Sequence, residues 1–255
     1  MNAIQLLTRY VPRPYLLKLS LLLSKFIYIF YLGSKYYCPC CKGHFRKFLP
    51  YGRIKPRYNV LCPKCLSLER HRLIWLYLEN KTTLFSDELK MLHFAPEQCF
   101  QSNFKSMSNL NYITADIESP LAMMKMDITD IPLENNSVDV ILCNHLLEHV
   151  EDDRKAMKEM CRILTTNGWA IIQPHIDTAR SVTFEDPSVT SPEEREKLFN
   201  QNDHVRVYGS DYKDRLVEAG FTVHIEDYLN DVDEKELEKY ALESNRQIYL
   251  CKRKR

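Results

Sequence analysis

Four cysteines occur as two pairs whose spacing suits a tetrahedral metal site. Cys38 and Cys41 form one Cys-x2-Cys pair, Cys62 and Cys65 form the other, and twenty residues separate the pairs. Two intervening residues let both thiolates of a pair reach one centre from a tight turn, and four thiolates make the tetrahedral sulfur site that zinc favours. The spacing predicts one structural zinc ion, because four thiolates leave no coordination position open for catalysis.

The ligand set of this predicted zinc site has alternatives. Cys40 lies inside the first pair and could replace Cys41 with altered geometry, and His44 is a lesser substitute. The alternative is that the four cysteines are buried thiols that bind no metal. Each pair contains a proline, however, and this favours a defined turn at each pair. A segment of about 35 residues also buries too little surface to fold without such a staple. We therefore expect zinc here.

The overall composition is that of an ordinary globular chain. Of 255 residues, 45% are hydrophobic and 27% are charged, with only 6 glycines and 12 prolines. These values exclude a disordered chain, a collagen-like repeat and a low-complexity array. Nine cysteines, an odd number, with paired spacing and no secretion signal favour a reducing compartment over a disulfide framework. We expect a cytoplasmic protein.

The charge is distributed unevenly along the chain. Residues 1–72 carry 14 Lys and Arg but a single acid, Glu69, whereas residues 73–255 carry 21 basic and 33 acidic residues. A front end of charge +13 predicts an anionic partner, such as nucleic acid, a membrane surface or the acidic remainder of the same chain. Charge alone does not choose among these partners.

An apolar stretch at Leu16–Leu32 bears on this choice. It is slightly short for a membrane span and contains Lys18 and Lys25, and no cleavage site follows it. We therefore reject a cleaved signal peptide and disfavour a transmembrane helix. The stretch predicts a basic apolar helix within residues 1–35 that lies on an anionic membrane, placing the protein peripherally on the inner membrane face. The alternative is a helix that packs on the protein itself.

Beyond the cysteines, short apolar runs alternate with amphipathic ones. This pattern predicts an α/β fold with a mostly parallel, Rossmann-like sheet covered by helices on both faces. We divide the chain into an N-terminal helix (1–35), a small zinc-ribbon-like segment (36–70) and a Rossmann-like domain (71–255). Strands are predicted at 89–94, 112–115, 138–143, 169–173, 221–225 and 247–251, and helices at 68–78, 155–164, where Asn167-Gly168 ends the helix, and 211–219.

The stretch around residues 90–150 carries a recognisable pattern. It reads Met126-Asp127-Ile-Thr-Asp-Ile-Pro-Leu, then Asn-Asn-Ser-Val-Asp139, then Asn144-His-Leu-Leu-Glu-His149, and is followed by Glu159-Met-Cys-Arg162 and Asn167-Gly168. These blocks resemble class I S-adenosylmethionine-dependent methyltransferases. With the cysteine pairs, the chain resembles a bacterial subgroup of that family with a four-cysteine front end. The resemblance covers nearly all of residues 36–225 and implies S-adenosylmethionine as cofactor.

One turn departs from the family pattern. The family's first βα turn is glycine-rich, but here it reads Phe94-Ala95-Pro96-Glu97 without glycine. Ala95 falls where the first glycine is expected, and Glu97 where the second is expected. The resemblance implies a variant cofactor site in which the carboxylate of Glu97 faces the cofactor's amino group; the alternative is a structural turn with Glu97 in solvent.

Five further residues are predicted to complete the cofactor site. Asp116 ends the second strand about 20 residues after the turn, where an acid accepts hydrogen bonds from ribose hydroxyls. The resemblance implies that Asp127 and Ile128 contact adenine, while Asn144 and His145 lie at the lip of the cleft. The alternatives are ordinary caps: Asp116 at a strand end and Asp127 at the start of a turn.

The acceptor side is less defined by the sequence. His204 lies in a polar segment with Asp203, Arg206 and Tyr208, between the fifth strand and the last helix, and is our candidate general base. The other candidates are His145, His149 and His175. The alternative for the polar segment is a loop network that holds the surrounding chain in place.

Three function classes follow from these observations. The first is a methyltransferase acting on a small molecule, a sugar or a lipid-linked glycan. The second is a zinc-ribbon RNA methyltransferase, in which the basic front end grips phosphates. The third is a non-catalytic zinc-ribbon interaction protein with a degenerate cofactor site. We favour the first class.

Overall fold

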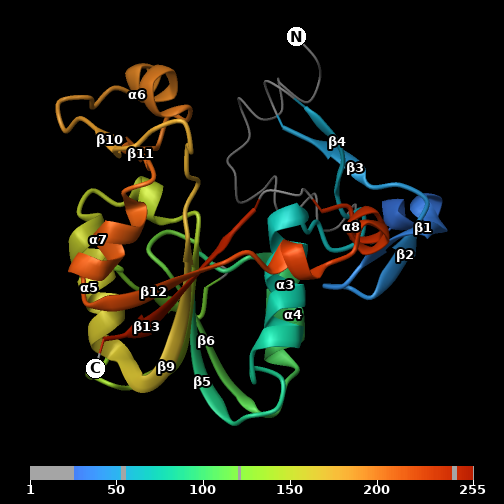
Figure 1. Cartoon of the computed structure of the whole chain (residues 1–255), viewed down its shortest axis with the longest axis horizontal. Coiled ribbons are helices and arrows are strands. Elements are labelled where there is room, and N and C mark those ends of the chain that lie inside the picture. The colour runs from blue at the N-terminus through green and yellow to red at the C-terminus, as the bar shows by residue number, and fades with distance from the viewer. Residues whose placement is uncertain (1–25, 53–55, 120–121, 243–245, 255) are drawn as a thin grey trace. The chain divides into compact units, whose positions relative to one another are not determined.

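The computed structural model describes residues 26–52, 56–119, 122–242 and 246–254, and these divide into two compact units (Figure 1). Unit 1 contains the described residues of 26–85, 97–107 and 227–247. Unit 2 contains those of 86–96, 108–226 and 248–254. The expected boundary at residue 71 differs from this division, since residues on both sides of it belong to unit 1.

Unit 2 is built on a seven-stranded sheet with the order β12-β13-β9-β8-β5-β6-β7 (Figure 1). The strands are β5 (Leu89–Phe94), β6 (Leu110–Asp116), β7 (Met124–Lys125), β8 (Val138–Asn144), β9 (Leu164–Gln173), β12 (Phe221–Glu226) and β13 (Ile248–Arg253). Strands β5 to β9 pair in parallel, and only β13 runs antiparallel to both of its neighbours. The α/β fold with a mostly parallel, Rossmann-like sheet is confirmed.

Helices and short elements complete unit 2. The helices are α5 (Asp153–Ile163), α6 (Pro192–Phe199) and α7 (Tyr212–Glu218), with a 3-10 turn η2 (Leu147–His149). Two short strands, β10 (Phe184–Glu185) and β11 (Arg206–Val207), pair antiparallel beside the main sheet. The Asp152 side chain caps α5 by accepting from the Lys155 amide, which explains where this helix begins.

The prediction that Asn167-Gly168 ends the helix before β9 is wrong. Helix α5 already ends at Ile163, and β9 begins at Leu164. The register between β8 and β9 shifts between Val138 and Val140, so Asn167-Gly168 lies within an irregular part of the strand. A Cβ at Gly168 would come within 2.7 Å of the Asp139 carbonyl oxygen, so glycine serves close strand approach there.

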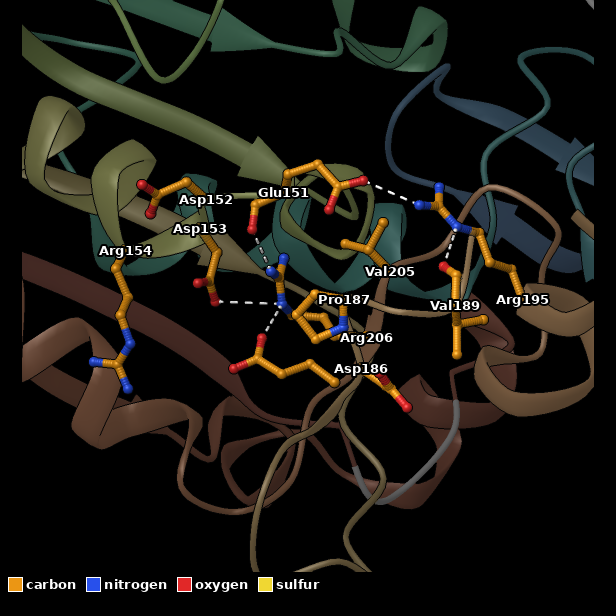
Figure 2. A pocket seen from close by; sticks show the side chains of 11 residues that line it. Glu151, Asp152, Asp153, Arg154, Asp186, Pro187, Val189, Arg195, Val205 and Arg206 are labelled. Carbon is orange, nitrogen blue, oxygen red and sulfur yellow. Dashed lines mark hydrogen bonds and ion pairs between the residues drawn. The ribbon is translucent and has the colours of Figure 1, made fainter. Parts of the chain in front are cut away.

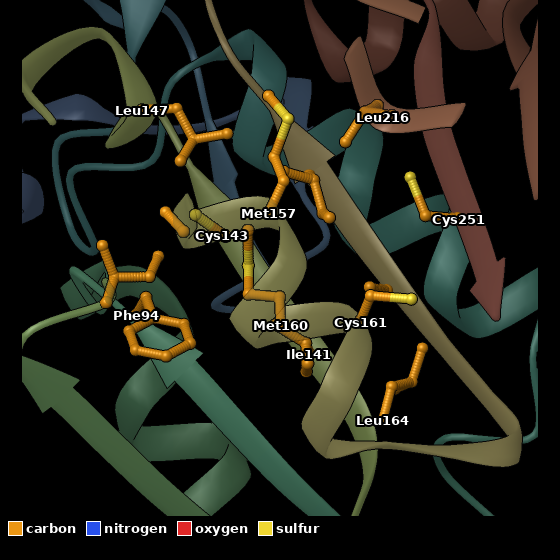
Figure 3. Close-up of a cluster of buried hydrophobic side chains, with 14 of the residues drawn as sticks. Phe94, Ile141, Cys143, Leu147, Met157, Met160, Cys161, Leu164, Leu216 and Cys251 are labelled. Atoms are coloured by element: carbon orange, nitrogen blue, oxygen red, sulfur yellow. The ribbon is translucent and has the colours of Figure 1, made fainter. Parts of the chain in front are cut away.

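The main core of unit 2 lies between the sheet and α5 and α7 (Figure 3). Helix α5 presents Met157, Met160 and Cys161 to the sheet at helical spacing, and all three are buried. Cys143 and Cys251 are also buried in this core, on β8 and β13. Cys161, Cys143 and Cys251 are therefore packing residues, and none of the nine cysteines, all of which lie in the described part of the chain, forms a disulfide.

Unit 1 combines the cysteine segment with three later helical elements. Its elements are η1 (Tyr28–Tyr31), β1 (Leu32–Cys38), β2 (Gly43–Phe45), β3 (Leu49–Tyr51), β4 (Arg57–Leu61), α3 (Glu69–Lys81), α4 (Gln98–Lys105), η3 (Tyr228–Asp231) and α8 (Glu234–Tyr240). Trp75 on α3 stacks on Phe100 and Phe104 of α4, with ring centroids 5.9 and 5.5 Å away. These aromatic contacts form the apolar part of the unit.

A fully buried arginine holds distant parts of unit 1 together. Arg72 donates to the backbone carbonyls of Val60 and Ser67, and to those of Tyr240 and Ala241, at 2.7–3.0 Å. Its guanidinium also lies 4.6 Å from the ring centre of Phe48. The planar guanidinium suits this role because its donors point in several fixed directions.

The N-terminal apolar stretch falls mostly outside the described residues, since the description begins at Phe26. Where it can be tested, the expected helix to residue 35 is wrong, because β1 begins at Leu32. The Arg46 amide donates to the Tyr31 carbonyl, and a Cβ built on Gly33 would come within 2.8 Å of Arg46. The chain at residues 31–33 therefore runs close beside the chain at Arg46, as it does where β1 pairs with β2. No helix among the described residues is long and apolar enough to cross a membrane.

Candidate functional site

The paired cysteines converge in unit 1. One sulfur atom from each of Cys38, Cys41, Cys62 and Cys65 lies within 4.8 Å of the other three. The Cys38 and Cys65 sulfurs are 3.5 Å apart, and those of Cys41 and Cys62 are 3.7 Å apart. Burial raises the pKa of the Cys38 thiol, but hydrogen bonds from the neighbouring cysteines outweigh it, and the pKa is lowered well below its usual range. Such a group can hold a thiophilic ion.

The local backbone explains why Cys41, and not Cys40, joins this group. The chain leaves the first pair through Lys42 and the second pair through Leu66, and both residues lie in the left-handed region. The Cys40 sulfur is not one of the four that converge and lies 3.8 Å from the His71 carbonyl oxygen, while the Cys40 carbonyl accepts from the Asn103 side chain. The ring of His44, the other possible ligand, lies against that of Tyr37 in a tilted arrangement, with ring centroids 4.8 Å apart.

In unit 2, three predicted cofactor residues lie side by side at the carboxyl edge of the sheet. Phe94 pairs with Ala115 on β6 and with Cys143 on β8, so the next residues, Ala95, Asp116 and Asn144, end adjacent strands. In open α/β sheets this edge is where ligands bind. The structure thus brings together residues that are about 20 and 50 positions apart in the sequence.

Two residues at this edge have strained backbones. Ala95 has φ of 43° and His145 has φ of 51°, in the left-handed region that non-glycine residues rarely adopt. Such a conformation costs alanine roughly 1–2 kcal/mol. Ala95 therefore adopts the backbone for which glycine is suited, at the position where the related enzymes were expected to carry glycine. Strain of this kind gathers at binding sites.

The side chain of Asn144 provides the clearest indication of a ligand-binding site at this edge. Its side chain is 4% exposed, and neither its amide oxygen nor its amide nitrogen has a hydrogen-bond partner among the described residues. A buried polar group without a partner costs about 1–3 kcal/mol. The ligand-free protein therefore holds a donor and an acceptor ready for a polar ligand, as a nucleoside cofactor requires.

The two predicted cofactor carboxylates are partly occupied by their own turns. Asp116 Oδ1 accepts from the amides of Glu118 and Ser119 at 2.8 and 2.7 Å. Asp127 Oδ1 accepts from both the amide and the hydroxyl of Thr129. In each case only one carboxylate oxygen is used within the described residues. The capping roles considered for both acids are therefore present, and the ribose and adenine roles stay predictions.

The other predicted cofactor residues are divided between the units. Phe94 and Ile128 are buried in the core of unit 2, and Pro96 follows Ala95 in the turn. Glu97 belongs to unit 1, where it is the N-cap residue of α4. Its carboxylate lies 3.9 Å from Nε2 of His71, and His71 Nδ1 accepts from the Leu68 amide. The predicted contact of Glu97 with the cofactor stays a prediction.

Glu148 is a site residue that sequence reasoning missed. It is 2% exposed, and its Oε1 lies 3.3 Å from His145 Nδ1 and 2.5 Å from the His175 amide. Burial raises the pKa of Glu148, but the His145 contact and the backbone hydrogen bonds outweigh burial, and the pKa is lowered. Its second oxygen has no hydrogen-bond partner among the described residues. In the sequence, this residue could have been noticed as an acid within the largely apolar run Leu146–Val150.

The polar segment 203–208 separates into two roles. His204 is 7% exposed, its ring centre is 4.6 Å from that of His149, and His149 in turn lies 3.4 Å from Asp203. Burial, with the imidazole of His149, lowers the pKa of His204. Arg206 and Tyr208 instead form the loop network considered from the sequence. Tyr208 donates to Asp153, and the Arg206 guanidinium contacts Glu185 at 2.9 Å.

This loop network lines a cavity of about 240 Å³ in unit 2 (Figure 2). Arg206 and Arg215 both pair with Asp153 and Glu185. The hydrogen bond from Arg215 outweighs partial burial and, with Arg206, lowers the pKa of Glu185 to about 2. None of the predicted cofactor residues lines this cavity, and its central arginine is already paired, so we interpret it as part of the framework.

Comparison with known proteins identifies the fold of unit 2. Residues 89–172 match a protein family described as a methyltransferase domain. Residues 89–172 of unit 2 form a methyltransferase domain. Its parallel strands and their order place the matched stretch at the centre of the sheet. The resemblance stated from the sequence is thereby confirmed at the level of the family.

Individual relatives are distant. Ajmaline N-methyltransferase of Rauvolfia serpentina is 29% identical over 79 residues, which are 31% of this chain and 26% of that enzyme. Among solved structures, the YcgJ protein of Bacillus subtilis has a TM-score of 0.49 at 14% identity, covering 72% of this chain and 99% of that one. The CurJ carbon methyltransferase has a TM-score of 0.45 at 14% identity, covering 72% and 53%. The chain thus spans about a quarter of the curated relative it matches.

Proposed function

We propose that this protein transfers a methyl group from S-adenosylmethionine to an acceptor, with the cofactor at the carboxyl edge of β5, β6 and β8. The observation that carries the proposal is the buried, unpartnered amide of Asn144 beside the left-handed Ala95. The cofactor supplies an electrophilic methyl group on a sulfonium. The residues described here bind and orient it, and orientation alone contributes on the order of 7–11 kcal/mol in well-aligned pairs.

The proposed roles at this edge follow from the donor set. Asp116 keeps one carboxylate oxygen outside its turn and would accept from ribose hydroxyls. Asp127 and Ile128 would hold adenine, the first through its remaining oxygen and the second through apolar contact. Asn144 would use its donor and its acceptor together, which removes the cost of leaving them unpaired.

On the acceptor side, we assign His204 and Glu148 different tasks. Glu148 holds the ring of His145 and the His175 backbone and so fixes the lip of the site. His204 would handle the acceptor. Its Nδ1 lies 3.2 Å from the Phe199 carbonyl oxygen, which leaves Nε2 as the ring nitrogen with an available lone pair. This role suits an oxygen or nitrogen acceptor whose proton must leave.

Calorimetric titration with S-adenosylmethionine tests the binding step of this proposal. Wild-type protein should bind the cofactor, and Asp116→Ala should weaken binding by about 1–3 kcal/mol because polar partners are stranded. The acceptor then comes from a methyl-transfer screen with labelled cofactor against small-molecule, glycan and RNA fractions. Absence of any cofactor binding would favour the non-catalytic interaction protein instead.

We also propose that Cys38, Cys41, Cys62 and Cys65 bind one structural zinc ion. The convergence of their four sulfurs supports this proposal, and all four positions of a tetrahedral ion would be filled by protein. The ion would stabilise unit 1 and would take no part in methyl transfer. Metal analysis of protein purified without added zinc should find about one equivalent at this site.

A third proposal concerns the partner of the basic front end, which we infer to be an anionic membrane surface. Phe26, Ile29 and Phe30 are 65%, 54% and 74% exposed, so apolar side chains stand in solvent at the start of unit 1. Arg46 and Lys47 lie within 6.0 Å of the Tyr31 ring centre. Aromatic and cationic side chains together suit the lipid headgroup region, whereas an apolar run has no use on RNA.

A further inference from the structure

Three side chains of unit 2 form a second cluster of metal-ligand type. His149, Asp203 and His204 each offer one donor atom, and these atoms lie within 4.8 Å of one another. His149 Nδ1 is 3.4 Å from an Asp203 carboxylate oxygen, and the two imidazole rings are nearly perpendicular, at 85°. Two imidazoles and one carboxylate that converge in this way match the ligand sets of catalytic zinc and of non-haem iron.

The backbone holds the two ligand-bearing segments in place. His149 ends η2, whereas Asp203 and His204 precede β11. The Val205 amide donates to the Glu148 carbonyl at 2.9 Å, which joins the segments between their ligands. Arg206 adds hydrogen bonds to the carbonyls of Leu147, Val150 and Glu151. The cluster is therefore preorganised, as a metal site requires if it is to bind without refolding.

One of the histidines has the supporting contact that metal-bound histidines show. His204 Nδ1 lies 3.2 Å from the Phe199 carbonyl oxygen, which accepts its proton. A metal-ligating histidine almost always donates its other ring N–H to a carbonyl or carboxylate, and this contact fixes its tautomer and orientation. The contact leaves Nε2 to supply the lone pair, on a residue that is only 7% exposed.

We propose that His149, Asp203 and His204 form a binding site for a divalent transition metal ion, with Zn²⁺ as its best match. Three protein ligands leave one position of a tetrahedral ion open, which is the arrangement of catalytic and not of structural zinc. The open position would take the acceptor's oxygen or nitrogen and lower its pKa. With an ion bound, His204 would act on the acceptor only as a metal ligand, and the acceptor's proton would leave to solvent water.

Zinc content at saturation tests this assignment. Full-length wild-type protein and the variants are equilibrated with excess Zn²⁺, separated from free ion by gel filtration, and analysed by mass spectrometry for metal per chain. Asp203→Asn and His149→Asn should each carry about one equivalent less than wild type. The Asp203 side chain is 48% exposed, so its amide replacement leaves packing intact, and circular dichroism checks the fold.

Two controls separate this site from other histidines and from the cysteines. His224 is an exposed histidine on β12, and His224→Asn should keep the full zinc content. Cys62→Ser should lose metal from unit 1 only, so that combining it with Asp203→Asn lowers the content further. Calorimetric titration of Zn²⁺ into the Cys62→Ser protein should show a binding event that Asp203→Asn weakens at least tenfold.

The proposal is overturned if Asp203→Asn and His149→Asn carry as much zinc as wild type, or if His224→Asn loses as much as they do. In that case His149 and Asp203 form a simple ion pair beside His204. The measurement needs neither cofactor nor acceptor, so its failure leaves the proposed methyl transfer standing, and failure of methyl transfer leaves this site standing.

Discussion

Replacing Asn144 with leucine should make the ligand-free protein more stable and remove cofactor binding. The wild-type side chain buries an amide donor and an amide acceptor that have no partners among the described residues. Each such group costs about 1–3 kcal/mol, and leucine is an apolar residue of similar size. The different shape of leucine in a packed site costs about 1–3 kcal/mol. After this cost is subtracted, we expect the free energy of unfolding to rise by about 1–3 kcal/mol.

The assay is thermal or urea unfolding of wild type and Asn144→Leu, each with and without S-adenosylmethionine. At this chain length 1 kcal/mol corresponds to about 2–4 °C in Tm. Wild type should gain about 2.7 kcal/mol at a cofactor concentration one hundred times its Kd, because ligand binding stabilises the folded state. The variant should start from a higher midpoint and gain nothing. This pattern of higher stability with lost function distinguishes a binding site from a packing residue.

A matched control is Asn111→Leu, because Asn111 is an exposed asparagine on strand β6 of the same sheet. An exposed substitution of this kind changes stability by no more than about 0.5 kcal/mol and should leave the cofactor shift intact. If Asn144→Leu is less stable than wild type, or if it keeps the full cofactor shift, the amide is not held in readiness for a ligand and our reasoning about this edge fails.

Other predictions follow from features already described. Ala95→Gly should stabilise the ligand-free protein by up to about 1 kcal/mol in urea unfolding, by relieving the left-handed backbone; destabilisation would show that the strain is not real. Glu185, with its pKa lowered from 4.5 to about 2, stabilises the fold fully above pH 4.5 and loses this effect as the pH falls toward 2. Acid titration of wild type and Glu185→Gln should therefore show stabilities that converge toward pH 2, and a constant gap would contradict the ion-pair network. Cys62→Ser should remove about one zinc equivalent from unit 1, and an unchanged content would mean that the cysteine ligand set is wrong. Phe30→Ser should weaken sedimentation with anionic vesicles in moderate salt, since apolar burial is not screened; steep loss of structured RNA binding with salt, with no vesicle binding, would support an RNA partner instead.

Most strands could be read from the sequence because their apolar runs are short and bounded. The run at 89–94 is observed as β5 with the same limits, and that at 138–143 as β8 with one more residue. The cysteine spacing likewise indicated that the cysteines at 38–41 and at 62–65 converge on one centre. It could not choose Cys41 over Cys40, since that choice depends on the left-handed turn at Lys42 and on the contact of Cys40 with the His71 carbonyl.

The site was harder to predict because its decisive features are not local. Asn144 could be placed at a strand end, but whether its amide has a partner depends on every neighbour in space. Glu148 sits within an apolar run, which indicates burial, but the sequence does not show its partners, the His145 ring and the His175 amide. The division into two units also escaped prediction, because residues 97–107 and 227–247 join the cysteine segment through contacts such as that of Arg72 with the Tyr240 carbonyl.

The contacts of Arg72 carry a consequence for how the chain folds. Its partners Tyr240 and Ala241 lie 168 and 169 positions further along the sequence. Closing such a long loop loses conformational entropy before the stabilising contact has formed. Contacts between residues far apart in the sequence therefore slow folding. During synthesis, at about 5–20 residues per second, Arg72 would wait on the order of ten seconds for these carbonyls.

Unit 2 shares this dependence on late residues, since β13, at Ile248–Arg253, inserts between β9 and β12. Until it arrives, β9 and β12 both have an exposed edge with unpaired backbone groups, which invites pairing with other chains. Unit 1 can therefore finish folding only after residues 227–247 have been made, and unit 2 only after residues 248–254 have followed them. We expect nascent chains stopped near residue 226 to be open to proteolysis in both units and to depend on chaperones, even though most of the sheet has already been synthesised.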